Sequence, residues 1–268
     1  KKSLLEAKSN GGDLRILYSP IEAVKIAKNN PDKEVVFFAV GFETTAPANA
    51  LSVLHAQKEG LKNYSILVSH VLVPPAMEAI LDDKFCNINA FLGAGHVCAI
   101  MGYKEYYPLA EKYKIPIVIT GFEPLDLVQG IYMAVRQLEK GIFEVENQYS
   151  RVVKEEGNKA ALKVINQVFE VGAREWRGIG EIPNSGYVLT KEFKSFDAEL
   201  KFGISHIKVP ENPNCIAGNI LKGIKKPHQC DQFGKKCTPS NPLGAPMVSS
   251  EGACAAYYHF SSNLMTEQ

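Results

Sequence analysis

The residues best suited to bind metal lie near the C-terminal end of the sequence. Four of the six cysteines fall there, at Cys215, Cys230, Cys237 and Cys254. Thiols gathered in this way usually share disulfides, a metal ion or an iron–sulfur cluster. The sequence shows no secretory leader, and its other two cysteines, Cys86 and Cys98, are isolated in apolar surroundings. Both observations disfavour disulfides, which belong to oxidising compartments.

A bound metal can take the form of a zinc ion or an iron–sulfur cluster. Structural zinc also uses four thiolates, but its ligands usually come in pairs about two to four residues apart, and no such pair exists here. A cubane cluster is a larger object, so widely separated turns of one loop can supply its ligands. Prolines and glycines interrupt residues 215–254 repeatedly, as expected of a loop-rich wrap. We therefore expect an iron–sulfur cluster, with zinc as the alternative.

A second set of candidate residues lies in the first half of the chain. Each follows closely on a predicted strand, and the set comprises Glu43, His70, His96 and Glu123. In open parallel sheets, ligands bind at the carboxyl ends of the strands, so these positions are candidates for a common site. We select Glu43, Thr44, Thr45 and His96 as candidate catalytic residues. His96 has further support, because Gly93 and Gly95 free the backbone around it for close approach to a ligand.

Each of these residues also has a purely structural interpretation. Glu43 suits the first turn of a helix, where an acid complements the helix dipole. Thr44 or Thr45 suits the N-cap of the same helix. For His70, a hydrogen-bonded histidine at a sheet edge is the simpler interpretation.

The elements that would position these residues alternate between strand and helix. Strands are predicted at 14–18, 35–40, 65–69, 89–92 and 115–120, and helical stretches follow each of them. Ser19, Pro20 and Glu22 predict a capping box that starts the first helix. The continuous apolar run at 35–40 is typical of a strand covered on both faces. This alternation predicts the α/β class, a Rossmann-like, doubly wound parallel sheet with βαβ units.

Sequence texture divides the chain into three parts. An amphipathic helix is predicted at 157–171, and after Trp176 the sequence changes to glycine, proline and short β-like pieces. We predict the end of an N-terminal α/β domain at 1–33, a central α/β domain with a connecting helix at 34–175, and a loop-rich iron–sulfur cluster domain at 176–268.

Composition argues against several classes of partner. Thirty basic and 29 acidic residues give the 268-residue chain a formal net charge of +1. Nothing in this balance indicates binding to nucleic acid or to an anionic membrane. No apolar run is long enough to span a membrane, so we expect a cytoplasmic protein.

Three motifs resemble a known family. The spacing of the four cysteines, with CTPSNPLGAPMVSSEGACAAYY across the last two, is similar to the C-terminal cluster region of the HypD family of hydrogenase maturation proteins. Gly41-Phe42-Glu43-Thr44-Thr45 and Gly95-His96-Val97 resemble two motifs that line the family's cleft. In relatives the next residue is commonly serine, whereas this chain has Cys98, whose role is open. The family's N-terminal third has no counterpart here, so we expect a fragment.

The resemblance implies a specific function. Cys215, Cys230, Cys237 and Cys254 would hold a [4Fe-4S] cluster. The protein would be a scaffold and redox component for assembly of the Fe(CN)2CO group of nickel–iron hydrogenases, with a transient iron that carries cyanide and carbon monoxide. Its partners would be a HypC-type chaperone and a HypE-type cyanide donor. The alternative is an iron–sulfur or zinc-stabilised α/β protein with a structural or regulatory metal site.

Overall fold

The computed structural model describes residues 3–207 and 209–261 of the chain. Its strands are β1 (Val35–Gly41), β2 (Tyr64–His70), β3 (Phe91–Ala94), β4 (Ile117–Thr120), β5 (Val145–Asn147), β6 (Phe169–Trp176) and β7 (Gly180–Leu189). Its α-helices are α1 (Leu4–Ser9), α2 (Pro20–Asn29), α3 (Ala46–Lys58), α4 (Val73–Leu81), α5 (Gly95–Met101), α6 (Tyr106–Tyr113), α7 (Pro124–Lys140), α8 (Lys159–Val168), α9 (Ala198–Lys201), α10 (Ala217–Leu221) and α11 (Ala253–Phe260). Three short 3-10 helices are η1 (Lys191–Phe196), η2 (Pro227–Gln229) and η3 (Ala245–Met247).

The strands form two parallel sheets and one antiparallel hairpin. β1 pairs in parallel with β2, and β4 pairs in parallel with both β3 and β5. β6 and β7 form the hairpin. The mixed α/β class and the parallel pairing are thus confirmed, but the expectation of one continuous doubly wound sheet is wrong. Isolated bridges join Ile66 of β2 to Asp197, and Val71, which follows β2, to Gly186 of β7.

The prediction of a strand at 14–18 is also wrong. These residues form neither helix nor strand, and the side chains of Ile16 and Tyr18 are 87% and 97% exposed. The helix that follows begins at Pro20 as predicted, with Ser19 as its N-cap. The predicted capping box is absent, because the Ser19 side chain makes no cap hydrogen bond. The carboxylate of Glu22 instead accepts the backbone N–H of Tyr18.

β1 is buried on one face only. Val36, Phe38 and Val40 are 45%, 53% and 57% exposed, whereas Ala39 is buried. The expectation of a strand covered on both faces is therefore wrong. Within the described residues β1 pairs with β2 alone, so its other edge has no partner strand.

Helix boundaries agree more closely with the sequence. The helical stretches predicted after the strands at 35–40, 65–69, 89–92 and 115–120 correspond to α3, α4, α5 and α7. Gly141 ends α7 in the left-handed conformation, with φ of 64°. α6 was not predicted. The helix expected at 157–171 corresponds to α8, which is shorter, from Lys159 to Val168. Its side chains Ile165 and Val168 are buried.

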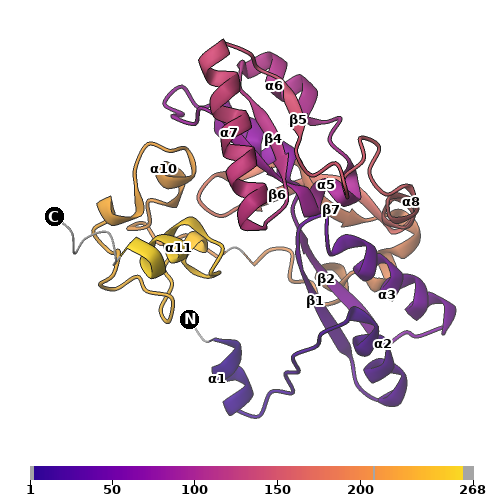
Figure 1. The fold of residues 1–268 in the computed structure, drawn as a ribbon. Coiled ribbons are helices and arrows are strands. Elements are labelled where there is room, and N and C mark those ends of the chain that lie inside the picture. Colours follow the sequence, from indigo (N-terminus) through magenta and orange to yellow (C-terminus); the bar gives the residue numbers. More distant parts are fainter. Residues whose placement is uncertain (1–2, 208, 262–268) are drawn as a thin grey trace.

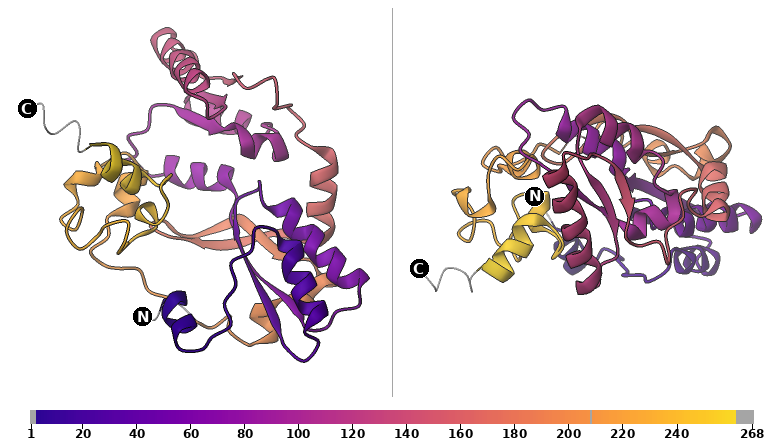
Figure 2. Two further views of the ribbon diagram at one scale, coloured as in Figure 1. Left: turned by 60° about the horizontal axis from the view of Figure 1, so that its bottom comes forward. Right: turned by 45° about the horizontal axis from the view of Figure 1, so that its top comes forward.

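Three apolar cores stabilise the molecule. One joins α2, α3, β1, β2, α8 and the hairpin; a second joins β3 and β4 with α4, α5 and α6; a third lies in the cysteine segment. Residues 209–261 make a lobe of their own beside the α/β part, in orange and yellow in Figure 1 and Figure 2. The hairpin spans the domain boundary expected near residue 175. None of the described helices combines the length and apolarity of a membrane span.

Candidate functional site

The four clustered cysteines line one cavity. Its wall also contains the apolar side chains of Ile220, Phe233, Leu243 and Met247. No carboxylate or imidazole belongs to this lining. All six cysteines of the chain are free thiols, so the disulfide interpretation finds no support. The fold has therefore gathered a donor set made only of thiols.

Short turns position each thiol. Cys215 closes a turn in which its N–H donates to the carbonyl of Asn212 at 2.9 Å. Cys230 is the C-cap of η2, and the N–H of Cys237 donates to the carbonyl of Gln232 at 2.9 Å. Cys254 lies in the first turn of α11. The prolines and glycines that prevent regular structure here are what allow four separate turns to face one cavity.

Backbone groups approach the thiols closely. The N–H of Leu243 lies 3.5 Å from the Sγ of Cys237 and donates to it. A side chain at Gly244 would overlap the Sγ of Cys215, so only glycine fits at this position. Met247, 1% exposed, closes the apolar wall. These contacts limit the access of water, most fully at the buried Cys237 and Cys254, and provide a backbone donor to sulfur; low exposure and hydrogen bonds to sulfur both tune iron–sulfur sites.

The environment of Cys254 and Cys215 favours the protonated form of these two thiols when no metal is bound. Burial raises the pKa of Cys254 to about 11 and raises the pKa of Cys215, and the neighbouring thiols add to both effects. Among the described residues, no group of three or more His, Cys, Asp or Glu side chains is arranged to hold a single metal ion. Four thiols around an apolar cavity nevertheless match the donor set of a cubane cluster, whose binding would release their protons.

Glu43 is the most unusual residue of the second candidate set. It follows β1 and its carboxyl is 2% exposed. Oε1 accepts the N–H of Val73 at 2.9 Å, and Oε2 has no hydrogen-bond partner among the residues that the structure describes. Burial raises the pKa of Glu43 to about 7, the charge of Glu105 adds to this rise, and the hydrogen bonds oppose it. Glu43 can therefore gain or lose a proton near neutral pH.

Other buried acids surround this carboxyl. Cys98 on α5 and Tyr106 on α6 are fully buried. Burial raises the pKa of Cys98 to about 12 and raises the pKa of Tyr106 well above its usual value, and the charge of Glu43 contributes to both shifts. The same two causes raise the pKa of Tyr187 on β7. Cys98 thus lies near Glu43 as an uncharged thiol.

His70 ends β2 and is completely buried. Its Nε2 lies 2.8 Å from Nδ2 of Asn49 and 3.0 Å from Oγ1 of Thr45. Because an amide nitrogen only donates, Nε2 is the acceptor and the ring proton lies on Nδ1. Burial lowers the pKa of His70 to about 4, and the charge of Arg174 contributes. This histidine is neutral. Its Nε2 is hydrogen-bonded, as the simpler interpretation predicted, but its buried Nδ1 has no partner among the described residues, so the ring is only partly satisfied. Thr45 belongs to its surroundings.

The remaining two candidates lie on the surface. Thr44 is exposed in the turn after β1. His96, also exposed, stacks on Phe122 with ring centroids 4.8 Å apart and meets Tyr149 edge-on at 6.2 Å. The structure therefore puts Glu43 and His96 in different surroundings, one a buried acid cluster and the other an exposed aromatic group.

Sequence reasoning missed several neighbours of Glu43. Tyr106, Tyr187 and Glu105 come from α6 and from the hairpin, which no strand-end pattern indicates. Glu123 is the N-cap residue of α7, and Asp126 in the first turn of this helix accepts two hydrogen bonds from the guanidinium of Arg151, at 2.8 and 2.5 Å.

Comparison with known proteins identifies the family. The HypD family model, described as "Hydrogenase formation hypA family", matches residues 1–261. The chain belongs to the HypD family. It is 46% identical to the hydrogenase maturation factor HypD of Rhodobacter capsulatus over 272 residues, which cover all of this chain and 72% of that protein. It is 48% identical to HypD of Azotobacter vinelandii over 264 residues, which cover 96% of this chain and 70% of that protein. It is 44% identical to HypD of Escherichia coli (strain K12) over 259 residues, which cover 96% of this chain and 69% of that protein.

Membership of the HypD family gives the two sets of residues a common context. Hydrogenase maturation is the activity that the names of these relatives state. Both the thiol cavity and the buried Glu43 lie within the matched residues, so each belongs to the region shared with the HypD family.

Proposed function

We propose that this chain acts in nickel–iron hydrogenase maturation as a scaffold and redox component for assembly of the Fe(CN)2CO group. In this proposal Cys215, Cys230, Cys237 and Cys254 hold a [4Fe-4S] cluster. The observation that carries it is the single apolar cavity that all four thiols line. A HypC-type chaperone and a HypE-type cyanide donor are its proposed partners, and the cytoplasm its proposed location.

The cluster, when bound, supplies or accepts electrons one at a time. The chain's own residues supply its environment. Ile220, Phe233 and Met247 exclude water, and Leu243 donates its N–H to the Cys237 sulfur. Such hydrogen bonds and low exposure are the means by which a protein sets the potential of a cluster.

Proton transfer is assigned to Glu43. Attachment of cyanide and carbon monoxide to a transient iron, the cargo of this reaction, requires that protons be taken up or released nearby. A carboxyl with a pKa of about 7 suits that role, because both of its forms are populated at neutral pH. The unpartnered Oε2 is the atom that would exchange the proton. Thr44, Thr45 and His96 stay in the proposal as residues near the strand ends.

Metal content tests the cluster assignment. Single Cys→Ala variants at 215, 230, 237 and 254 are purified without oxygen, and iron, zinc and acid-labile sulfide are measured. Each variant should lose most of its iron and sulfide. Cys86→Ala is the matched control, since Cys86 is a free thiol that does not line the cavity. Full iron and sulfide in three of the four variants would show that the assignment is wrong, and zinc without sulfide would support the structural-metal alternative.

Maturation activity tests the role of Glu43. Glu43→Gln, carried in an intact maturation factor, should abolish hydrogenase maturation while leaving iron and sulfide unchanged. Glutamine keeps the oxygen that accepts from Val73 but cannot carry the proton. Unimpaired maturation would reduce Glu43 to a structural acid.

A further inference from the structure

The cysteine segment carries a local excess of positive charge. Residues 215–254 contain five lysines against two acidic residues, Asp231 and Glu251, a net charge of +3, whereas the whole chain carries +1. Lys222 is neutralised by Asp83 of the α/β part at 2.6 Å. The other four lysines, which we term the lysine set, are exposed: Lys225, Lys226, Lys235 and Lys236.

The lysine set has no acidic partner within the part of the chain that the structure describes. Its members flank the thiols along the chain. Lys225 and Lys226 come just before η2, whose C-cap is Cys230, and Lys235 and Lys236 come directly before Cys237. Unpaired like charges repel one another, so this arrangement costs stability within the protein and becomes favourable when an acidic surface is present.

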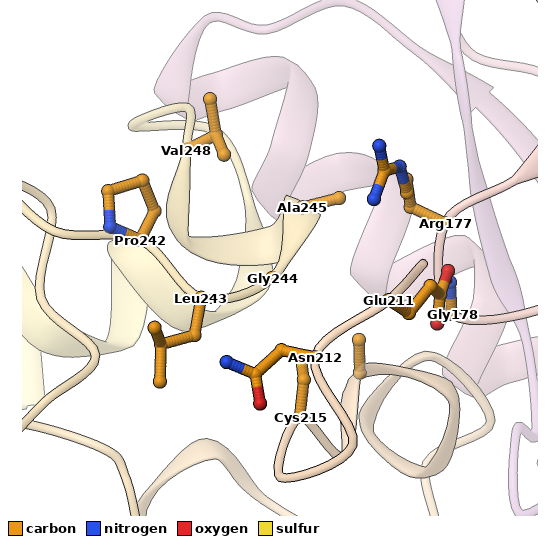
Figure 3. A pocket seen from close by; sticks show the side chains of 11 residues that line it. Arg177, Gly178, Glu211, Asn212, Cys215, Pro242, Leu243, Gly244, Ala245 and Val248 are labelled. Atoms are coloured by element: carbon orange, nitrogen blue, oxygen red, sulfur yellow. The ribbon is translucent and has the colours of Figure 1, made fainter. Parts of the chain in front are cut away.

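A fifth cation lies beside the thiols. Arg177, in the turn of the β6–β7 hairpin, lines a cavity of about 330 Å³ together with Cys215. Figure 3 shows its guanidinium next to Ala245, on the side of the pocket formed by the hairpin. The acid in the same cavity, Glu211, already accepts the N–H of Gly178 at 2.5 Å. Cys215 and Cys230 are the two half-buried thiols, whereas Cys237 and Cys254 are buried. Arg177 thus lines a cavity with the half-buried Cys215, and Lys225 and Lys226 precede the half-buried Cys230 in the chain.

We propose that the lysine set and Arg177 form the docking surface for a small acidic protein that carries one electron at a time, and that this protein reduces the cluster. This inference rests on the proposed function, because it requires a cluster at the four thiols. In the step, the reduced carrier loses one electron and the [4Fe-4S] cluster gains it, passing from the 2+ to the 1+ state with no bond made or broken. Interfaces in electron-transfer encounters are typically small and steered by charge, and exposed cations next to the cluster ligands in the chain provide such charge.

Reduction kinetics test this docking surface. Iron-loaded protein is mixed in a stopped-flow instrument with reduced plant-type [2Fe-2S] ferredoxin, an acidic carrier, and in parallel with the methyl viologen radical, a cation. Lys225→Gln/Lys226→Gln/Lys235→Gln/Lys236→Gln should lower the second-order rate constant for ferredoxin about tenfold or more at low ionic strength. The difference should shrink to roughly twofold or less at high salt, since the Debye length falls to about 3 Å at 1 M. Reduction by the viologen cation should be unchanged or faster.

The matched control removes the same number of charges elsewhere. Lys58→Gln/Lys140→Gln/Lys163→Gln/Lys191→Gln alters exposed lysines of the α/β part and should leave both rates unchanged. If the fourfold variant loses its cluster, the pairs Lys225→Gln/Lys226→Gln and Lys235→Gln/Lys236→Gln are tested separately. Each pair should lower the rate constant for reduction by ferredoxin about threefold.

The possible outcomes separate the two proposals. Wild-type protein without iron and sulfide overturns the proposed function and this inference with it. A loaded fourfold variant that ferredoxin reduces at the wild-type rate overturns this inference alone. Equal slowing with both reductants also overturns it, because the lysines would then act on the cluster and not on docking. An unchanged ferredoxin rate with lost retention on immobilised RNA would assign the surface to nucleic acid instead.

Discussion

Glu43→Gln removes a carboxyl whose protonation is coupled to folding. Burial raises the pKa of Glu43 to about 7 in the folded protein, from an ordinary value of 4.5. The folded state therefore keeps this proton over a pH range in which the unfolded chain has lost it. One pKa unit corresponds to about 1.4 kcal/mol, so above neutral pH the ionised carboxyl costs the folded state about 3 kcal/mol. The cost is absent below about pH 4.5, grows as the pH rises to about 7, and is then complete.

Chemical unfolding measures this cost directly. Wild type, Glu43→Gln and the surface control Glu111→Gln, which lies exposed on α6, are unfolded in urea under reducing conditions at pH 5, 6, 7 and 8. The free energy of unfolding of Glu43→Gln relative to wild type should rise by about 2.5 kcal/mol between pH 5 and pH 8. Glu111→Gln should follow wild type at every pH. A difference that reports only the lost packing of the carboxyl would be independent of pH.

Parallel pH profiles for wild type and Glu43→Gln would refute the reasoning, because they would mean that folding does not perturb this carboxyl. A second variant tests the cause of the shift. The charge of Glu105 contributes to the raised pKa of Glu43, so Glu105→Gln should lower that pKa and move the pH window of the wild-type cost downward. Isotope-edited infrared spectroscopy of the protonated carboxyl band reports the pKa itself.

Two further predictions follow from local geometry. Gly244→Ala should remove most bound iron and sulfide, because the added Cβ would overlap the Sγ of Cys215. The control Gly93→Ala should keep both, because its Cβ would make ordinary contacts at 3.5 Å. Equal metal content in the two variants would contradict this prediction. Phe38→Lys should reduce aggregation without loss of stability, since Phe38 is 53% exposed on a strand with one unpaired edge among the described residues. Light scattering at equal protein concentration measures the aggregation. Unchanged scattering would show that aggregation begins elsewhere.

Sequence patterns predicted the strands β1 to β4 and the helices α2, α3, α4, α5, α7 and α8, because these elements depend on local periodicity and on proline and glycine boundaries. The strand expected at 14–18 shows the limit of this approach. An apolar run specifies a strand only if another strand pairs with it, and within the described residues none pairs with this run. Likewise, the run at 35–40 predicted burial on both faces, but burial depends on what packs against the strand, and nothing covers Val36, Phe38 and Val40 fully.

The candidate sites divide in the same way. The thiol cavity was predictable because residue type alone restricts what four cysteines can bind, and their turns lie in one stretch of chain. The buried state of Glu43 was not predictable, because it depends on α6 and on the hairpin, which are distant in sequence. His96 met every sequence criterion for a cleft residue, yet its exposed ring packs on Phe122.

The β6–β7 hairpin links the two sites physically. Along the hairpin, the ring centroids of Tyr187 and His70 lie 6.5 Å apart. The ring centroids of Trp176 and Phe42, the residue before Glu43, lie 6.3 Å apart. At its turn, the N–H of Gly178 donates to Glu211 next to the cysteine segment. A single antiparallel hairpin thus contacts the surroundings of the buried carboxyl and of the thiols. Rigid elements can carry energetic coupling between sites, so we expect a change in the charge of the proposed cluster to reach the proton at Glu43 through this hairpin.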